Sequence, residues 1–148
     1  MNDKNEYYTL TGYKLLGEQF ITEAMEDYLE MIYRLSLTEK SVTIKMIADQ
    51  LHVRPSSVTK MCQKLLHSGF ICMERYGNVY LSESGEKLGA YLLWRHSLIE
   101  RLLRFLNGKD FSLKQVEKIE HFVDDITLNH IEQFLVKFVI FKRKCPLF

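Results

Sequence analysis

The hydrophobic positions from residue 21 onward repeat at helical spacing in two short segments. In the first, Thr22 is suited to cap a helix running to about Leu35, with one apolar face made of Met25, Tyr28, Leu29 and Ile32. In the second, Thr43 is suited to cap a helix over 44–51, with a buried stripe made of Ile44, Ile47, Ala48 and Leu51. The pattern therefore predicts two amphipathic helices in succession.

A third helix is predicted directly afterwards. Residues 52–54 form a short break, and Pro55 suits the first helical position because its missing N–H is not needed there. This helix ends near His67, and Gly69 can adopt the left-handed conformation that closes many helices. Its predicted inward side chains are Val58, Met61, Cys62 and Leu65. Two short apolar runs, 70–74 and 79–81, flank a turn with Gly and Asn and predict a hairpin.

The rest of the chain is predicted to be helical. Ser82 opens a long helix to about Leu106, and further helices are expected over 112–124 and 128–142. The order helix, helix, tight turn, helix, hairpin is that of a winged helix-turn-helix, whose helix after the turn enters the major groove of DNA. We predict a mainly α fold with an N-terminal arm over 1–20, a winged helix-turn-helix DNA-binding domain over 21–82, and a C-terminal helical domain over 83–148 that begins with the long linking helix.

The composition is that of an ordinary globular protein and narrows the possible compartments. The chain has 148 residues, of which 47% are hydrophobic and 26% are charged. Its apolar runs are far shorter than the ~18 residues of a membrane span, and no signal-peptide pattern opens it, so we expect no membrane association. Three cysteines without a CxxC pair argue against a disulfide scaffold or a thiolate zinc site. We expect a cytoplasmic protein.

The net charge of +1 is the sum of two opposite segments. Residues 41–80 carry five basic and two acidic side chains, whereas residues 110–135 carry six acidic and two basic ones. A basic module beside an acidic one favours binding of nucleic acid by the first.

The outer face of the third predicted helix has the composition of a DNA-contacting surface. No acid occurs between positions 54 and 68. Hydroxyl and amide side chains there can contact base edges, and the cations can neutralise phosphates. An ordinary solvated face is the alternative, but the helix-turn-helix spacing favours DNA. The hairpin adds two weaker candidates, Arg75 and Tyr76. Those on and just before the helix are Arg54, Ser56, Ser57, Thr59, Lys60, Gln63 and Lys64.

A second set of polar side chains recurs at helical spacing on three predicted helices. The groups are Asp27 with Glu30, His96 with Glu100, and Glu117 with Glu120 and His121. Each group alone is typical of a solvated helix face. If the three helices pack together, the carboxylates repel one another unless a cation lies among them. An oxygen-rich set without thiolates suits Mn²⁺ or Fe²⁺, and Zn²⁺ remains possible.

Four segments between about residues 21 and 135 resemble the DtxR/MntR family of metal-dependent repressors. They are Met25-Glu26-Asp27-Tyr28-Leu29-Glu30 with Ile32-Tyr33, Pro55-Ser56-Ser57-Val58-Thr59-Lys60-Met61 with Gln63-Lys64-Leu65, Arg95-His96, and Val116-Glu117 with Ile119-Glu120-His121. The resemblance implies a repressor rather than an enzyme. It also implies a homodimer that binds a pseudo-palindromic operator in double-stranded DNA, with the C-terminal helices forming the metal-binding and dimerisation domain.

The same resemblance implies the metal and its ligands. The ligands carried over are Asp27, Glu30, His96, Glu117, Glu120 and His121. The iron branch of the family typically has Met at the first of these positions and Cys at the fourth. The resemblance therefore implies Mn²⁺ as the signal, with a pair of ions per subunit, and Fe²⁺, Zn²⁺ or Cd²⁺ as possible substitutes. The regulated genes would be metal-uptake genes in manganese homeostasis. Glu100 is outside this set, and at most it supports a ligand from outside the coordination sphere or bridges to one.

Two other functions stay open at this stage. A winged-helix regulator that answers an organic ligand would leave the metal match as a coincidence. A helical metalloenzyme of the di-metal type would use Glu-x-x-His on two helices, and no His in this chain has a Glu three residues before it.

Overall fold

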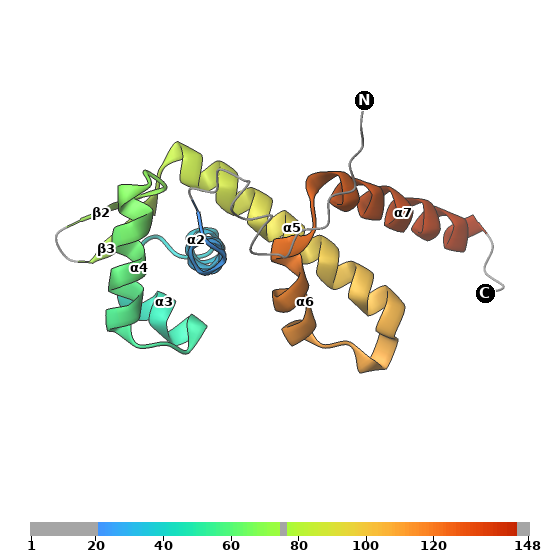
Figure 1. The fold of residues 1–148 in the computed structure, drawn as a ribbon, viewed down its shortest axis with the longest axis horizontal. Helices are drawn as coiled ribbons and strands as arrows, with labels where there is room; N and C mark the ends of the chain where they lie inside the picture. The colour runs from blue at the N-terminus through green and yellow to red at the C-terminus, as the bar shows by residue number, and fades with distance from the viewer. Residues whose placement is uncertain (1–20, 75–76, 145–148) are drawn as a thin grey trace, which may run out of the picture.

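The computed structural model describes residues 21–74 and 77–144, with side chains as far as residue 138. The predicted arm over 1–20 and the predicted hairpin contacts Arg75 and Tyr76 lie outside the described residues. The predicted mainly helical architecture is confirmed, with a small sheet beside the N-terminal helices (Figure 1).

The N-terminal half begins with three helices, α2 (Glu23–Ser36), α3 (Ile44–Leu51) and α4 (Pro55–His67). The two predicted threonine caps are confirmed: Thr22 and Thr43 each accept a hydrogen bond from the backbone N–H three residues later, both at 3.3 Å. His52 takes a left-handed conformation between α3 and α4, with φ 53°, and makes the tight turn. Pro55 opens α4 as predicted.

The sheet contains one strand that the pattern does not predict. The hairpin strands are β2 (Ile71–Met73) and β3 (Asn78–Leu81), and β1 (Val42–Thr43) pairs antiparallel with β3 to give the order β1-β3-β2. Val42 lies opposite Val79 in this pairing. A strand of two residues has no period of its own, so only the contact with β3 defines it.

The N-terminal core lies between α2, α3, α4 and the sheet. Leu29, Ile32, Ile47, Val58 and Leu65 are completely buried there. Because three helices and a sheet all contribute to one apolar cluster, the exposed outer face of α4 is held in a fixed orientation by the opposite, buried face.

The C-terminal half consists of α5 (Glu83–Asn107), a 3-10 turn η1 (Gly108–Asp110), α6 (Leu113–Ile119), a 3-10 turn η2 (Glu120–Phe122) and α7 (Asp125–Lys144). Two predicted boundaries are wrong. The helix expected over 112–124 ends at Ile119, and the last helix starts at Asp125. Asp124 accepts a hydrogen bond from the Thr127 N–H at 2.7 Å, so it caps the helix that follows instead of closing the one before.

Helix α5 connects the two halves (Figure 1). It passes close to α2 because Gly89 lacks a side chain: a Cβ added there would lie 2.6 Å from Tyr33 Cβ on α2. Nearer its start, α5 also passes close to the backbone between α4 and β2, where a Cβ added at Gly85 would lie 1.9 Å from the Phe70 carbonyl oxygen. The close approach at Gly89 places polar residues of α2 beside those of α5. Among the described residues, no helix is both long and apolar enough to cross a membrane.

Candidate metal centre and nucleic-acid interface

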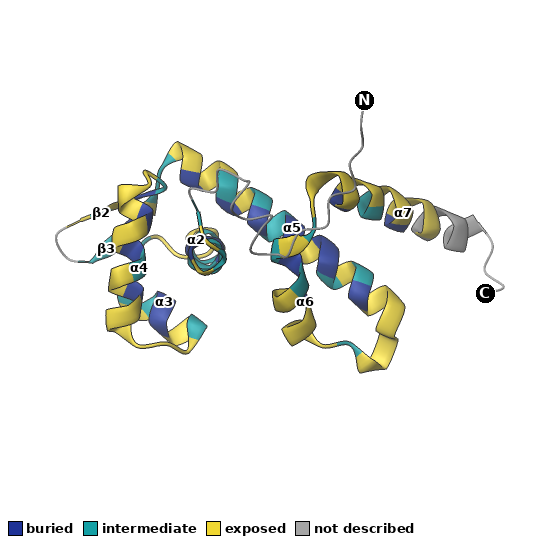
Figure 2. Cartoon of the chain, viewed as in Figure 1, coloured by how far each residue is buried: buried dark blue, intermediate teal, exposed yellow. Residues whose placement is uncertain are grey.

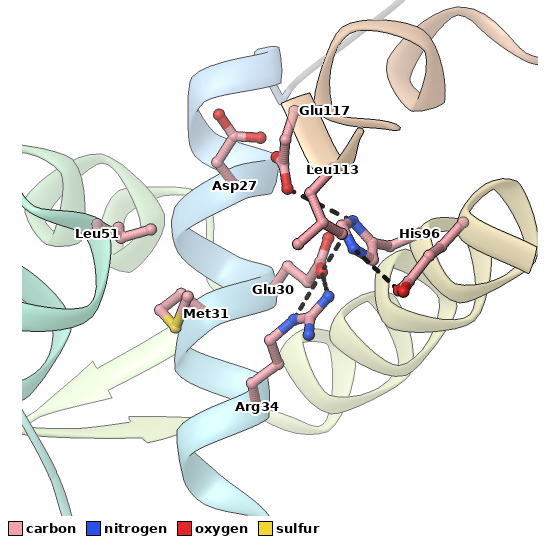
Figure 3. A pocket seen from close by; sticks show the side chains of 9 residues that line it. Asp27, Glu30, Met31, Arg34, Leu51, His96, Leu113 and Glu117 are labelled. Carbon is pink, nitrogen blue, oxygen red and sulfur yellow. Dashed lines mark hydrogen bonds and ion pairs between the residues drawn. The ribbon is translucent and has the colours of Figure 1, made fainter. Parts of the chain in front are cut away.

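The predicted metal-binding residues come from four elements and face one region between the two halves. Asp27 and Glu30 lie on α2, His96 on α5, Glu117 on α6, and the remaining pair, Glu120 and His121, on η2. Figure 3 shows the carboxylates of Glu30 and Glu117 both directed at the His96 ring, and both lie nearest to its Nδ1. Ending α6 at Ile119 puts the last pair in a 3-10 turn, where both side chains reach toward α2 and α5.

One group of possible ligands is deeply buried. Glu30, His96 and Glu120 are 8%, 6% and 1% exposed, and one ligand atom from each lies within 4.8 Å of the others. His96 Nδ1 is 2.8 Å from Glu120 Oε2 and 3.8 Å from both Glu30 Oε1 and Glu117 Oε1. Despite the short distance, His96 Nδ1 and Glu120 Oε2 are not aligned as a hydrogen bond, and neither makes a hydrogen bond to any other described residue.

A second group adjoins the first and shares one carboxylate with it. His121 Nε2 is 3.0 Å from Asp27 Oδ1 and 4.0 Å from Glu120 Oε1. The other oxygen of Glu120 is the one beside His96. Glu120 therefore lies between the two groups with one oxygen directed at each, the arrangement of a bridging carboxylate.

A pair of residues outside the predicted set orients His121. Glu26 Oε2 accepts a hydrogen bond from His121 Nδ1 at 2.7 Å and another from Arg95 at 2.7 Å. This fixes the proton on Nδ1 and leaves Nε2 directed at Asp27, the usual arrangement of a histidine that binds a metal. Sequence analysis missed this role. The available signal was adjacency, because Glu26 and Arg95 directly precede Asp27 and His96.

Two arginines bind carboxylates at the edge of the centre. Arg34 donates to Glu30 Oε1 from Nε at 2.8 Å and from Nη2 at 2.5 Å. Arg104 binds Glu100 Oε1 from Nε and Nη2, both at 2.8 Å. Glu100 Oε2 is 3.9 Å from His96 Nε2, so this residue borders the centre as expected.

Both histidines hold their protons more tightly than usual. Hydrogen bonds to Asp27 and Glu26 raise the pKa of His121 to about 10. Burial alone would lower the pKa of His96, but the adjacent Glu120 carboxylate outweighs it and raises this pKa. Burial raises the pKa of Glu30 and Glu117; Arg34 opposes the rise for Glu30, and repulsion from Glu120 adds to it for Glu117. Among the described residues, the negative charge of these carboxylates is therefore balanced by the protonated histidines and by neighbouring arginine side chains.

A cavity of about 320 Å³ adjoins this centre. Its lining combines carboxylates, His96 and Arg34 with the apolar side chains of Met31, Leu51 and Leu113 (Figure 3). Polar ligand atoms thus face an accessible space bordered by apolar side chains.

The predicted DNA-contacting residues of α4 lie on its solvent side. The exposed ones are Arg54, Ser56, Ser57, Thr59, Lys60, Gln63 and Lys64. Figure 2 shows this helix buried on one side and exposed on the other. The hydroxyl of Thr59 donates to the Pro55 carbonyl at 3.0 Å, while the rest of the set gives the face three cations and no acid.

A helix-turn-helix with an acid-free outer helix, joined to a second helical unit through a centre of histidines and carboxylates that both units supply, defines the class of metal-responsive winged-helix transcription regulators. Residues 20–79 match the family model "Iron dependent repressor, N-terminal DNA binding domain", and residues 82–146 match "Iron dependent repressor, metal binding and dimerisation domain". The chain belongs to the iron-dependent repressor family. It is a DNA-binding transcription regulator and not an enzyme.

Individual relatives agree with this assignment. The HTH-type transcriptional regulator MntR of Shouchella clausii (strain KSM-K16) is 43% identical over 103 residues, which are 69% of this chain and 72% of the relative. The regulator of the same name from Bacillus subtilis (strain 168) is 41% identical over 101 residues, 68% of this chain and 71% of the relative.

Solved structures show the same fold. The manganese regulator SloR superposes with a TM-score of 0.65 at 28% identity, covering 78% of this chain and 54% of that one. ScaR with bound Zn²⁺ gives a TM-score of 0.60 at 31% identity, covering 75% of this chain and 53% of that one. The present chain thus spans about half the length of these two regulators.

Proposed function

We propose that this protein is a Mn²⁺-dependent repressor that binds the operators of metal-uptake genes and keeps manganese within limits. The observation that carries the proposal is the position of the centre. Its carboxylates and histidines come from α2 of the DNA-binding half and from α5, α6 and η2 of the C-terminal half. A cation bound there would connect the unit that contacts DNA to the unit that dimerises.

The residues fit a divalent cation. His96 Nδ1 and Glu120 Oε2 are buried and lie 2.8 Å apart, but among the described residues neither makes a hydrogen bond of good geometry. Buried polar groups are rarely left in this state, and a cation between them would satisfy both. We assign Asp27, Glu30, His96, Glu117, Glu120 and His121 as the ligands. Four carboxylates, two imidazoles and no thiolate suit Mn²⁺, and the position of Glu120 suits a pair of ions per subunit. Fe²⁺, Zn²⁺ and Cd²⁺ are possible substitutes at such a site.

The bound metal would supply positive charge among the carboxylates. Without it, repulsion between Asp27 and Glu30 on α2 and Glu117 and Glu120 opposite disfavours close approach of the two halves. With it, the range of positions of the DNA-binding half narrows and the fraction competent for DNA rises. Coupling of about 1–3 kcal/mol is typical, which corresponds to roughly 5–150-fold tighter DNA binding.

The DNA-bound form would be a homodimer in the cytoplasm. Two α4 helices related by two-fold symmetry would occupy successive major grooves of a pseudo-palindromic operator, about 34 Å apart. The exposed set on α4 and the hairpin residues Arg75 and Tyr76 would contact the DNA. A second copy would cover the aromatic side chains that α5 and α7 expose, Phe105, Phe134 and Phe138.

The test is DNA binding to fragments of the source genome at fixed salt, with Mn²⁺ and with a chelator. We expect specific fragments to bind only with Mn²⁺. Glu120→Ala and Asp27→Ala should abolish the response to Mn²⁺ while the fold is retained. Glu86→Ala, which removes an exposed carboxylate near the start of α5, should leave it unchanged. Equal binding with and without metal would instead favour a regulator of the organic-ligand type.

A further inference from the structure

Arg34 is hydrogen-bonded to a carboxylate oxygen of the candidate metal centre. Its guanidinium group makes two hydrogen bonds to Glu30, and both go to Oε1. This is also the oxygen that lies 3.8 Å from His96 Nδ1, on the side of the carboxylate that faces the centre. Figure 3 shows the Arg34 side chain directed at Glu30 beside His96. A cation that is part of the protein thus already binds one of the proposed ligands.

The ordinary explanation of this pair is a surface ion pair near the end of a helix. Pairs of that kind at i,i+4 spacing contribute only a few tenths of a kcal/mol, and a cation in the last turn also suits the helix dipole. Burial argues against it, because the Glu30 side chain is only 10% exposed. A buried carboxylate that loses its cationic partner is left with an uncompensated charge. Glu30 can therefore separate from Arg34 only if another cation takes the place of the guanidinium group.

The chain contains a matched pair for comparison. Arg104 binds Glu100 at the same i,i+4 spacing, through the same two nitrogens, next to the same histidine. Glu100 is more exposed, at 27%, and it is not among the proposed ligands. Only the arginine on α2 therefore holds an oxygen that the metal would need.

We propose that Arg34 is an internal competitor of the metal: it holds Glu30 in the metal-free protein and sets the Mn²⁺ concentration at which the regulator responds. This inference rests on the proposed function. A divalent cation that binds Glu30 must either displace the guanidinium group or share the carboxylate with it, and the arginine charge repels the ion in both cases. Loss of Arg34 should therefore tighten metal binding.

The test measures Mn²⁺ binding directly, by the paramagnetic resonance signal of free Mn²⁺ in an anaerobic titration without DNA. Arg34 also favours the ionised form of Glu30, so the titration is run at about pH 8, where protons compete least. We expect Arg34→Met to bind Mn²⁺ roughly 10-fold more tightly. Loss of a partner that supports a metal ligand usually weakens binding by about 10-fold or more, and loss of a competing cation should change the affinity by a similar factor in the opposite direction. Arg34→Gln keeps a polar side chain without the charge and should change the affinity in the same direction. Arg104→Met should stay within about twofold of the unaltered protein.

The possible results separate the two proposals. If the unaltered protein binds Mn²⁺ and both Arg34 variants bind it equally or more weakly, the inference is wrong and the proposed function stands. If Arg34→Met does not fold, as judged by circular dichroism, the comparison rests on Arg34→Gln. If Arg104→Met tightens binding as much as the Arg34 variants, the effect is general electrostatics and not competition at Glu30. If the unaltered protein does not bind Mn²⁺, both proposals fail.

Discussion

The two halves of the molecule differ in how completely they bury their apolar side chains. The N-terminal cluster joins three helices and a sheet, and the large apolar side chains exposed in that half are scattered over separate elements: Leu37, Val53, Leu66 and Tyr80. The C-terminal cluster has half as many buried members, and more large apolar side chains are exposed around it: Phe105, Leu106, Leu113, Phe122, Ile126, Phe134, Val136 and Phe138. The first half is closed in itself, whereas the second presents a surface suited to a partner.

The strongest way to test this difference is to place a charge on the aromatic group of the C-terminal half. Phe105 lies edge-on to Phe134 and Phe138, with ring centroids 5.9 and 4.6 Å away. Buried aromatic side chains at the centre of an interface commonly contribute about 2 kcal/mol or more. We therefore expect Phe105→Glu to weaken the dimer by about 30-fold or more, as measured by sedimentation equilibrium.

The control is Leu37→Glu, which places the same charge on an exposed apolar position of the N-terminal half. We expect this variant to remain dimeric. If both variants dimerise as well as the unaltered protein, the aromatic group is not part of the interface, and the contrast between the halves has another cause.

The junction between the halves depends on the close packing of α5 on α2 at Gly89. A methyl group at Gly89 would meet Tyr33 on α2, and backbone movement would be needed to relieve the clash. We expect Gly89→Ala to lower the free energy of unfolding by about 1–3 kcal/mol, seen as a lower melting temperature. Ala90→Ser, at the adjacent exposed position, should change it by less than about 0.5 kcal/mol. A Gly89→Ala protein as stable as the parent would show that α2 and α5 are not tightly apposed.

The contact of His121 with α2 makes the stability of the metal-free protein depend on pH. Asp27 and Glu26 raise the pKa of this histidine from 6.5 to about 10 in the folded protein. A group with a raised folded pKa contributes stability that is complete below its unfolded pKa and is lost as the pH rises through the folded one. The metal-free protein should therefore lose thermal stability between pH 6.5 and about 10. His121→Gln should flatten this profile in a chelator, and an unaltered slope would contradict the assignment.

Local patterns were enough to predict most elements and to single out the groups of acidic and histidine side chains. The resemblance to the metal-dependent repressors reduced these groups to the six proposed ligands, but neither source indicated the partners of those ligands. Caps such as Thr22 and Thr43 act within one turn, so the sequence around them suffices. The contact of Glu26 with Arg95 and His121 joins residues far apart in the chain, and only the packing of α2 against α5 and η2 creates it. Glu26 alone has the pattern of a first-turn helix residue. The start of α7 was misplaced because Asp124 fits the end of one helix as well as the cap of the next.

The smallest expected effect concerns the N-terminal half alone. Lys60 is exposed on the outer face of α4, where we expect it to contact a phosphate and not a base. Lys60→Ala should weaken binding to all DNA sequences alike and reduce the slope of log affinity against log salt by about 0.9 per subunit. Lys114→Ala, which removes an exposed lysine from α6, should leave the slope unchanged. Because this contact does not involve the metal centre, the ratio of DNA affinity with and without Mn²⁺ should be preserved in Lys60→Ala. A loss confined to one operator would mean that Lys60 contacts a base, and a changed ratio would mean that the α4 surface and the metal centre are not independent.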